Sequence, residues 1–312
     1  MELDKTAIVI RQRSVPDLID LSLVVVRSYW KPLLTYAAVG VVPFWLFNTI
    51  ILRPFCDYDS ILMYDSFAID EGPYRVRYVM FLMGFVFLQT PIAMLGVTYF
   101  LGHTLFLQPT SFRELRSIAV KMLLGLVLVL GLFRFGVMAW LVVLLMPTQT
   151  EFDPLLEIFW LGVVLCGTAI LVRAFRPFAP EILMLEQAPM RSRTKTDDGQ
   201  SLAFRKRSYG LHSQLSGDLI VRAIAMLIAM LMMLVAVTLG ELFISGVFFG
   251  VWTWEWWMDI VIFPINLWLV AIWGTVFRFL SYLDCRTRLE GWELDLRLRA
   301  ESRRLMEANH VF

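Results

Sequence analysis

The chain of 312 residues is 58% hydrophobic and only 18% charged, with a mean hydropathy of +0.67. Soluble domains average about 45–50% apolar and about 25% charged residues, so this composition excludes an ordinary water-soluble protein. The net charge of +1 gives no overall attraction to nucleic acid, and we expect no nucleic-acid partner.

Six apolar stretches are long enough to cross a bilayer. A hydrocarbon core about 30 Å thick requires roughly 20 apolar residues at the rise of an α-helix. Several stretches exceed this length, and we expect their ends to tilt or to project beyond the headgroups. The sequence thus predicts an all-α, polytopic membrane bundle with spans at about 32–52, 78–107, 118–146, 154–175, 219–251 and 258–282.

Lys and Arg are distributed unevenly between the two sets of connecting segments. The predicted outer loops contain only Arg53, Arg75 and Arg77. Cytoplasmic loops carry the excess of basic residues, so the segments that contain most of the Lys and Arg residues are predicted to lie in the cytoplasm. This orientation places both termini there as well. The basic segments are the N-terminus, 108–121, 173–222 and the tail from 278.

A short helix is predicted before three of the spans. Ser14 is followed by Asp17, and Ser111 by Glu114, which is the spacing of a capping box at a helix start. Ser201 stands in the equivalent place before the fifth span, without the carboxylate. The sequence therefore predicts three hairpins of two spans, each introduced by a cytoplasmic interfacial helix.

Most of the circumference of the first of these helices is apolar, while Val24 intrudes on its polar side. The apolar residues are Leu18, Ile19, Leu21, Leu23, Val25 and Val26. Asp17, Asp20 and Arg27 fall on the opposite side. This pattern favours a helix that lies on the membrane surface with its apolar side towards the lipid.

Two further cytoplasmic segments are predicted around the last pair of spans. Residues 191–200 are polar, lack apolar side chains and indicate a flexible linker. Residues 283–308 have the acid-first pairs Glu293–Arg297 and Asp295–Arg299, which favour a C-terminal helix. This helix has two apolar stripes, so it either packs on its own bundle or docks a partner or another copy.

Four short segments next to the predicted spans share a recognisable pattern. They occupy residues 13–20, 179–186, 207–211 and 282–291. Together they resemble bacterial multi-pass membrane proteins related to the membrane domain of glycerophosphoryl diester phosphodiesterases. The resemblance implies a six-span bundle of the bacterial plasma membrane, here without the catalytic domain that some relatives carry. Tyr209, where the pattern would have Trp, and the 191–200 insertion depart from it.

Two charges, Arg134 and Glu241, fall deep within predicted spans. Arg134 lies about 20 Å along the third span, and Glu241, about 28 Å along the fifth, is its best available partner. A charge at this depth is costly and normally faces the bundle interior. The pair is either structural, with Arg134 alternatively reaching the outer headgroups, or a polar step in a transport path.

Other polar groups and prolines also lie within the spans. They indicate either interhelical hydrogen bonds with tolerated kinks or the broken helices of a transporter. These residues are Asn48, Gln89, Thr90, Asn266, Pro43, Pro91 and Pro264.

A basic cluster precedes the fifth span. Arg205, Lys206 and Arg207 lie next to the membrane. They either fix the topology alone or bind lipid headgroups, since each basic residue near an anionic leaflet contributes about 1 kcal/mol.

No catalytic, cofactor-binding or metal-binding pattern is present in the sequence, and we expect no cofactor. The first functional hypothesis is a non-catalytic scaffold or lipid-associated subunit of an envelope complex. Its partners would be membrane lipids, other envelope proteins or a second copy bound through the tail. The alternative is a small transporter or lipid flippase that uses the Arg134–Glu241 pair.

Overall fold

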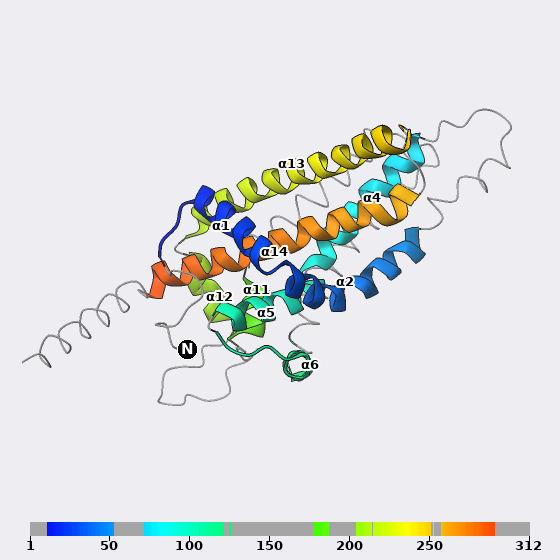
Figure 1. The fold of residues 1–312 in the computed structure, drawn as a ribbon. Coiled ribbons are helices and arrows are strands. Elements are labelled where there is room, and N and C mark those ends of the chain that lie inside the picture. The colour runs from blue at the N-terminus through cyan, green and yellow to red at the C-terminus, as the bar shows by residue number, and fades with distance from the viewer. Residues whose placement is uncertain are drawn as a thin grey trace, which may run out of the picture.

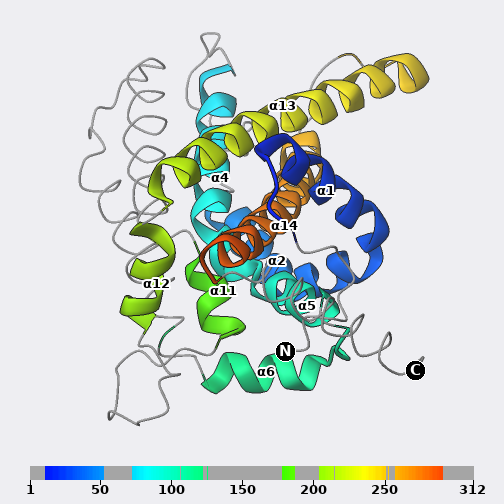
Figure 2. The same cartoon turned by 90° about the vertical axis from the view of Figure 1, so that its left-hand side faces the viewer.

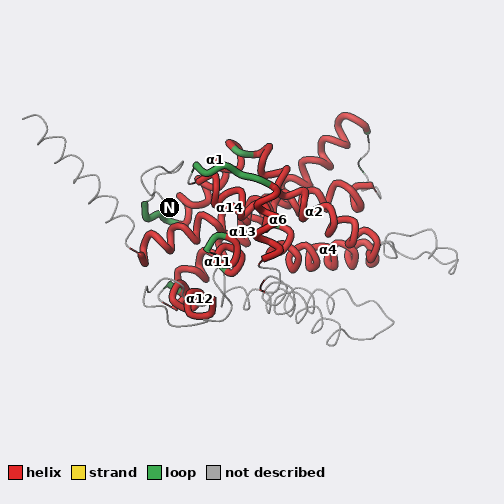
Figure 3. The backbone as a smooth tube through the Cα atoms, turned by 90° about the horizontal axis from the view of Figure 1, so that it is seen from below, coloured by secondary structure: helices red, strands yellow, loops and turns green. Residues whose placement is uncertain are grey.

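A computed structural model describes residues 11–52, 72–105, 107–121, 125, 178–186, 204–213, 215–250, 252 and 257–290. Every regular element in these ranges is a helix (Figures 1 and 3). The helices are α1 (Val15–Ser28), α2 (Trp30–Leu52), α4 (Gly72–Ala93), α5 (Leu95–Leu105), α6 (Phe112–Lys121), α11 (Ala179–Met184), α12 (Phe204–Ser213), α13 (Ser216–Phe249), the π-helical turn η4 (Met258–Ile262) and α14 (Phe263–Glu290).

Three described helices are long and apolar enough to cross a membrane. These are α2, α13 and the continuous run of η4 and α14. The pair α4 and α5 passes the same test as one bent span, which makes four. The predicted all-helical class is therefore confirmed for the described residues, and their long apolar helices are compatible with a membrane-spanning protein. The predicted spans 118–146 and 154–175 lie outside them, except for the first residues of 118–146.

Helix α14 forms the centre of the bundle. It packs against α1, α13, α4 and α5 (Figures 1 and 2). Of its apolar window 67% is buried inside the protein, against 17% for α2 and for α13. The outward sides of α2 and α13 are apolar, as expected for helices whose solvent is lipid.

The second predicted span is broken rather than straight. Helix α4 ends at Ala93, and α5 continues from Leu95 at an angle of 44°. Pro91 lies directly before the break. Because proline donates no backbone hydrogen bond and clashes with the preceding turn, Pro91 weakens the helix in the turn next to this break.

Two glycines let α2 approach the break closely. A Cβ atom on Gly40 would lie 2.1 Å from the carbonyl oxygen of Ala93, and one on Gly96 would lie 2.4 Å from that of Tyr36. No side chain fits at such distances. Small residues at helix crossings in membranes allow this close backbone packing.

Helix α1 is directed towards the bundle rather than towards the lipid. Its buried residues are Leu18, Ser22 and Val25, and the Trp273 indole N–H of α14 donates to the Ser22 hydroxyl at 2.7 Å. Val24 is exposed. The side of α1 that was predicted to face the lipid thus packs on α14, where Ser22 provides a polar contact, while the position of α1 at a membrane surface stays a prediction.

Two predicted boundaries also change. Residues 118–121, assigned to the third span, belong to the amphipathic helix α6. Helix α14 runs to Glu290 and passes the predicted start of the tail helix at 283 without interruption. The rest of 283–308 and the predicted linker 191–200 lie outside the described residues.

The predicted capping box at the start of α1 is confirmed. The Asp17 backbone N–H donates to the Ser14 hydroxyl, and the Ser14 N–H donates to the Asp17 carboxylate at 3.3 Å. At α6 the arrangement differs, because the Tyr99 hydroxyl accepts from the Ser111 N–H and donates to Glu114.

The Ser14 hydrogen bonds hold the pKa of Asp17 below its usual value. A lowered native pKa means that this cap stabilises α1 above the unfolded pKa and is lost as the pH falls through the native one. We expect Ser14→Ala to raise the pKa of Asp17, as measured by NMR titration of a carboxyl-labelled sample. An unchanged pKa would show that the side-chain bond is not the cause.

Candidate functional site: the polar end of the bundle

Most ion pairs among the described residues lie where α1 and α13 begin and α14 ends. We call this region the polar end. The four segments 13–20, 179–186, 207–211 and 282–290 meet there, although they are far apart in the sequence. Segments that lie at separate span ends in the sequence therefore form one site.

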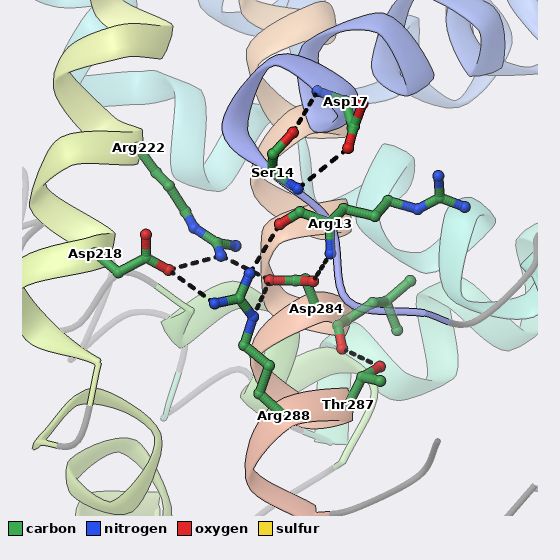
Figure 4. A network of polar contacts seen from close by, with 9 residues as sticks. Arg13, Ser14, Asp17, Asp218, Arg222, Asp284, Thr287 and Arg288 are labelled. Carbon is green, nitrogen blue, oxygen red and sulfur yellow. Dashed lines mark hydrogen bonds and ion pairs between the residues drawn. The ribbon is translucent and has the colours of Figure 1, made fainter. Parts of the chain in front are cut away.

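Asp284 is the central acceptor of this site (Figure 4). Its Oδ1 accepts the backbone N–H of Arg13 at 2.8 Å, and its Oδ2 accepts Nη2 of Arg222 at 2.6 Å. The Nε of Arg288 lies 2.9 Å from the same Oδ2. One carboxylate thus joins the segment before α1, helix α13 and helix α14.

Arg222 and Arg288 extend the network to a second carboxylate. Asp218 lies 2.7 Å from Nη2 of Arg222 and 3.6 Å from Nη1 of Arg288. Arg288 also donates to the carbonyl oxygen of Arg13 at 2.8 Å. Two arginines and two aspartates therefore balance in charge, while both backbone groups of Arg13 are held.

A second cluster attaches α11 and α12 to α14. Arg207 binds Glu186 through Nε at 2.7 Å and Nη2 at 3.0 Å, and the Tyr282 hydroxyl donates to the same carboxylate. Arg278 binds the fully buried Glu181 at 2.7 Å. The bidentate Arg207–Glu186 pair has the geometry that gives such pairs their strength.

The burial of these charges decides their energetic role. Arg222 and Asp284 are only 2% and 3% exposed. Removing one partner of a buried pair costs about 3–5 kcal/mol, whereas replacing the whole pair by apolar residues is often neutral. The network therefore specifies how the helices meet more than it adds to net stability.

Helix α12 presents two of the three predicted basic residues outwards. Phe204, Ser208 and Leu211 are buried against the bundle, which leaves Arg205 and Lys206 exposed. Arg207 is held by Glu186 instead. The structure thus separates the predicted lipid-contact residues into an outward pair and an inward anchor.

The predicted intramembrane pair is described at one residue only. Glu241 on α13 accepts from the Asn266 amide of α14 at 2.5 Å. Arg134 lies outside the described residues, so its pairing with Glu241 stays a prediction. The sequence indicated Asn266 as a polar group within a span and did not predict its hydrogen bond to Glu241.

Elsewhere in the bundle the polar groups make ordinary interhelical bonds. Asn48 and Gln89 exchange two amide hydrogen bonds of 2.9 and 2.7 Å between α2 and α4. The Tyr78 hydroxyl donates to the carbonyl oxygen of Asp259 at 2.9 Å. Within the described ranges, no three His, Cys, Asp or Glu residues are grouped so that they could hold a metal ion.

The sequence did not single out Asp218, Arg222 or Glu181 as site residues. A signal was present, since Asp218–Arg222 and Asp284–Arg288 are acid-first pairs four residues apart. On one helix such pairs indicate a solvated surface. Only the tertiary structure shows that the two pairs face each other and that Arg222 and Asp284 are buried between them.

Comparison of the chain with protein-family models, curated proteins and solved structures gave no match.

Proposed function

We propose that the chain is a non-catalytic component of the bacterial plasma membrane that acts as a scaffold or lipid-associated subunit of an envelope complex. Its polar end faces the cytoplasm, and its relatives are the bacterial proteins similar to the phosphodiesterase membrane domain. The meeting of all four family-like segments at the polar end supports this relationship.

One observation carries the lipid-associated role. Arg205 and Lys206 point outwards from the short helix α12, whose inner side is buried. The residue that follows them, Arg207, pairs with Glu186. Tyr209, on the same helix, is 71% exposed. Exposed basic and aromatic side chains on a helix next to a bilayer are suited to anionic headgroups.

The proposal predicts a loss of bound anionic lipid in the double variant Arg205→Gln and Lys206→Gln. At about 1 kcal/mol for each basic residue, we expect retention of phosphatidylglycerol to fall roughly tenfold or more. Native mass spectrometry of protein extracted in mild detergent measures the retained lipid.

The matched control is Arg27→Gln with Lys31→Gln, which removes the same charge from the junction of α1 and α2. Both control residues are exposed. Equal losses in the two double variants would mean that the basic residues act only through general attraction and that α12 is no specific site.

A transporter or lipid flippase is the second candidate. The broken span α4–α5 favours it, because transporters form substrate sites at discontinuous helices. In this case Glu241, with its predicted partner Arg134, would form a polar step within the bundle.

The transporter hypothesis predicts that Glu241→Gln combined with Arg134→Leu abolishes lipid movement while the protein still inserts. Scrambling of a fluorescent phospholipid in reconstituted vesicles measures this activity. Wild-type protein that scrambles no lipid, or a double variant that scrambles as fast as wild type, would remove the flippase from consideration.

A further inference from the structure

Helix α6 lies across the bundle rather than along it. Figure 1 looks along its axis while α13 and α14 run across the view, and Figure 2 shows it from the side. The Phe112 ring stacks on Tyr36 of α2 with 4.3 Å between ring centroids. Tyr36 is six residues after Trp30, about 9 Å into α2. Helix α6 therefore begins beside the second turn of a membrane-spanning helix.

The inner side of α6 is fixed to the bundle. Leu115 and Ile118 are buried. Glu114 accepts the Tyr99 hydroxyl of α5 at 2.9 Å and lies 3.7 Å from Nε2 of His103. The only acidic residue of α6 is thus used against α5 and does not neutralise the opposite side.

The outer side of α6 combines cations with large apolar residues. Phe112 and Val120 are 46% and 64% exposed, and Arg116 lies between them in the same row, four residues from each. Arg113 is exposed beside this row. At a headgroup boundary, arginines extend to phosphates and apolar side chains enter the acyl region.

We propose that α6 lies in the plane of the membrane interface, where Arg113 and Arg116 bind anionic phospholipid headgroups and Phe112 and Val120 contact the acyl chains. The charge excess, the transverse axis and the depth set by Tyr36 all favour a bilayer surface over a protein partner. This inference rests on the membrane embedding of the bundle and is independent of the lipid site proposed on α12.

A nitroxide label at Val120→Cys tests the proposal in the full-length chain. Cys56 and Cys166 are replaced by Ser, while Cys285 is fully buried and remains. The protein is reconstituted in vesicles of phosphatidylcholine alone and in equal parts of phosphatidylcholine and phosphatidylglycerol. Power saturation compares the access of oxygen with that of a water-soluble nickel chelate. Labels at Val39 and Gln12, both exposed, give the lipid and water references.

We expect the label on α6 to be reached by oxygen more than by nickel, as at Val39, and to lie deeper in the anionic vesicles. The double variant Arg113→Gln and Arg116→Gln should abolish this dependence on phosphatidylglycerol, whereas Arg205→Gln with Lys206→Gln should leave it unchanged. Nickel access equal to that at Gln12 would overturn the proposal. Protection from both reagents would also overturn it, because it would show that protein covers this side.

Discussion

Replacing Asp284 by Asn should destabilise the protein by about 3–5 kcal/mol, the cost of removing one partner from a buried ion pair. Arg222 reaches both of its carboxylates through Nη2 alone, so the variant leaves this 2%-exposed guanidinium with Asp218 as its only carboxylate partner among the described residues. Thermal unfolding in mild detergent, followed by the fluorescence of Trp273 and the other tryptophans, measures the loss.

Asp20→Asn is the control for this prediction, because Asp20 is an exposed acid on α1. It should change the melting temperature little. The second variant is Asp284→Leu combined with Arg222→Met, which removes both charges and should recover part of the lost stability. If the double variant is as unstable as the sum of its single changes, the pair contributes no coupling and this explanation is wrong.

Gly40→Ala should have a comparable effect for a steric reason. The added Cβ atom would lie 2.1 Å from the Ala93 carbonyl oxygen, and this neighbour is backbone that cannot rotate away. The helices must separate at the break between α4 and α5, which loses packing over the whole crossing. Overpacking costs about 1–3 kcal/mol, and a backbone clash places this variant at the upper end or beyond.

The matched control is Gly240→Ala in the long helix α13, where a Cβ atom would meet nothing within 4 Å. An alanine there should be neutral or slightly stabilising, because alanine has the higher helix propensity. Melting temperatures in the same detergent compare the two variants. Equal stability of both proteins would refute the proposed close approach of α2 to the break.

Sequence patterns predicted the elements of this bundle better than their contacts. Hydropathy located α2, α13 and α14, and the spacing of Ser14 and Asp17 located the start of α1. These features are local, since chain length and hydrogen bonding within a few residues determine them. Pro91 lies close to the break between α4 and α5, whereas α2 continues through Pro43 without interruption.

The sequence predicted less well which side of each helix packs against the bundle. The apolar side of α1 suited a lipid surface as well as a protein neighbour, and only Ser22 within it distinguished the two. Likewise, acid-first charge pairs such as those at the polar end are typical of a solvated helix surface as well as of a buried contact. Which charged residues pair depends on tertiary contacts between segments up to 275 residues apart. No local sequence pattern contains this information.

The hydrogen bond between Arg288 and Arg13 has a consequence for the membrane topology of the chain. Arg288, near the end of α14, holds the carbonyl oxygen of Arg13, so these two residues occupy the same side of any bilayer that the bundle crosses. A chain that leaves one side and returns to it must traverse the membrane an even number of times. Five crossings are thereby ruled out, and six are permitted. The two halves of a split reporter, attached before Arg13 and after Arg288, would therefore reassemble in one compartment.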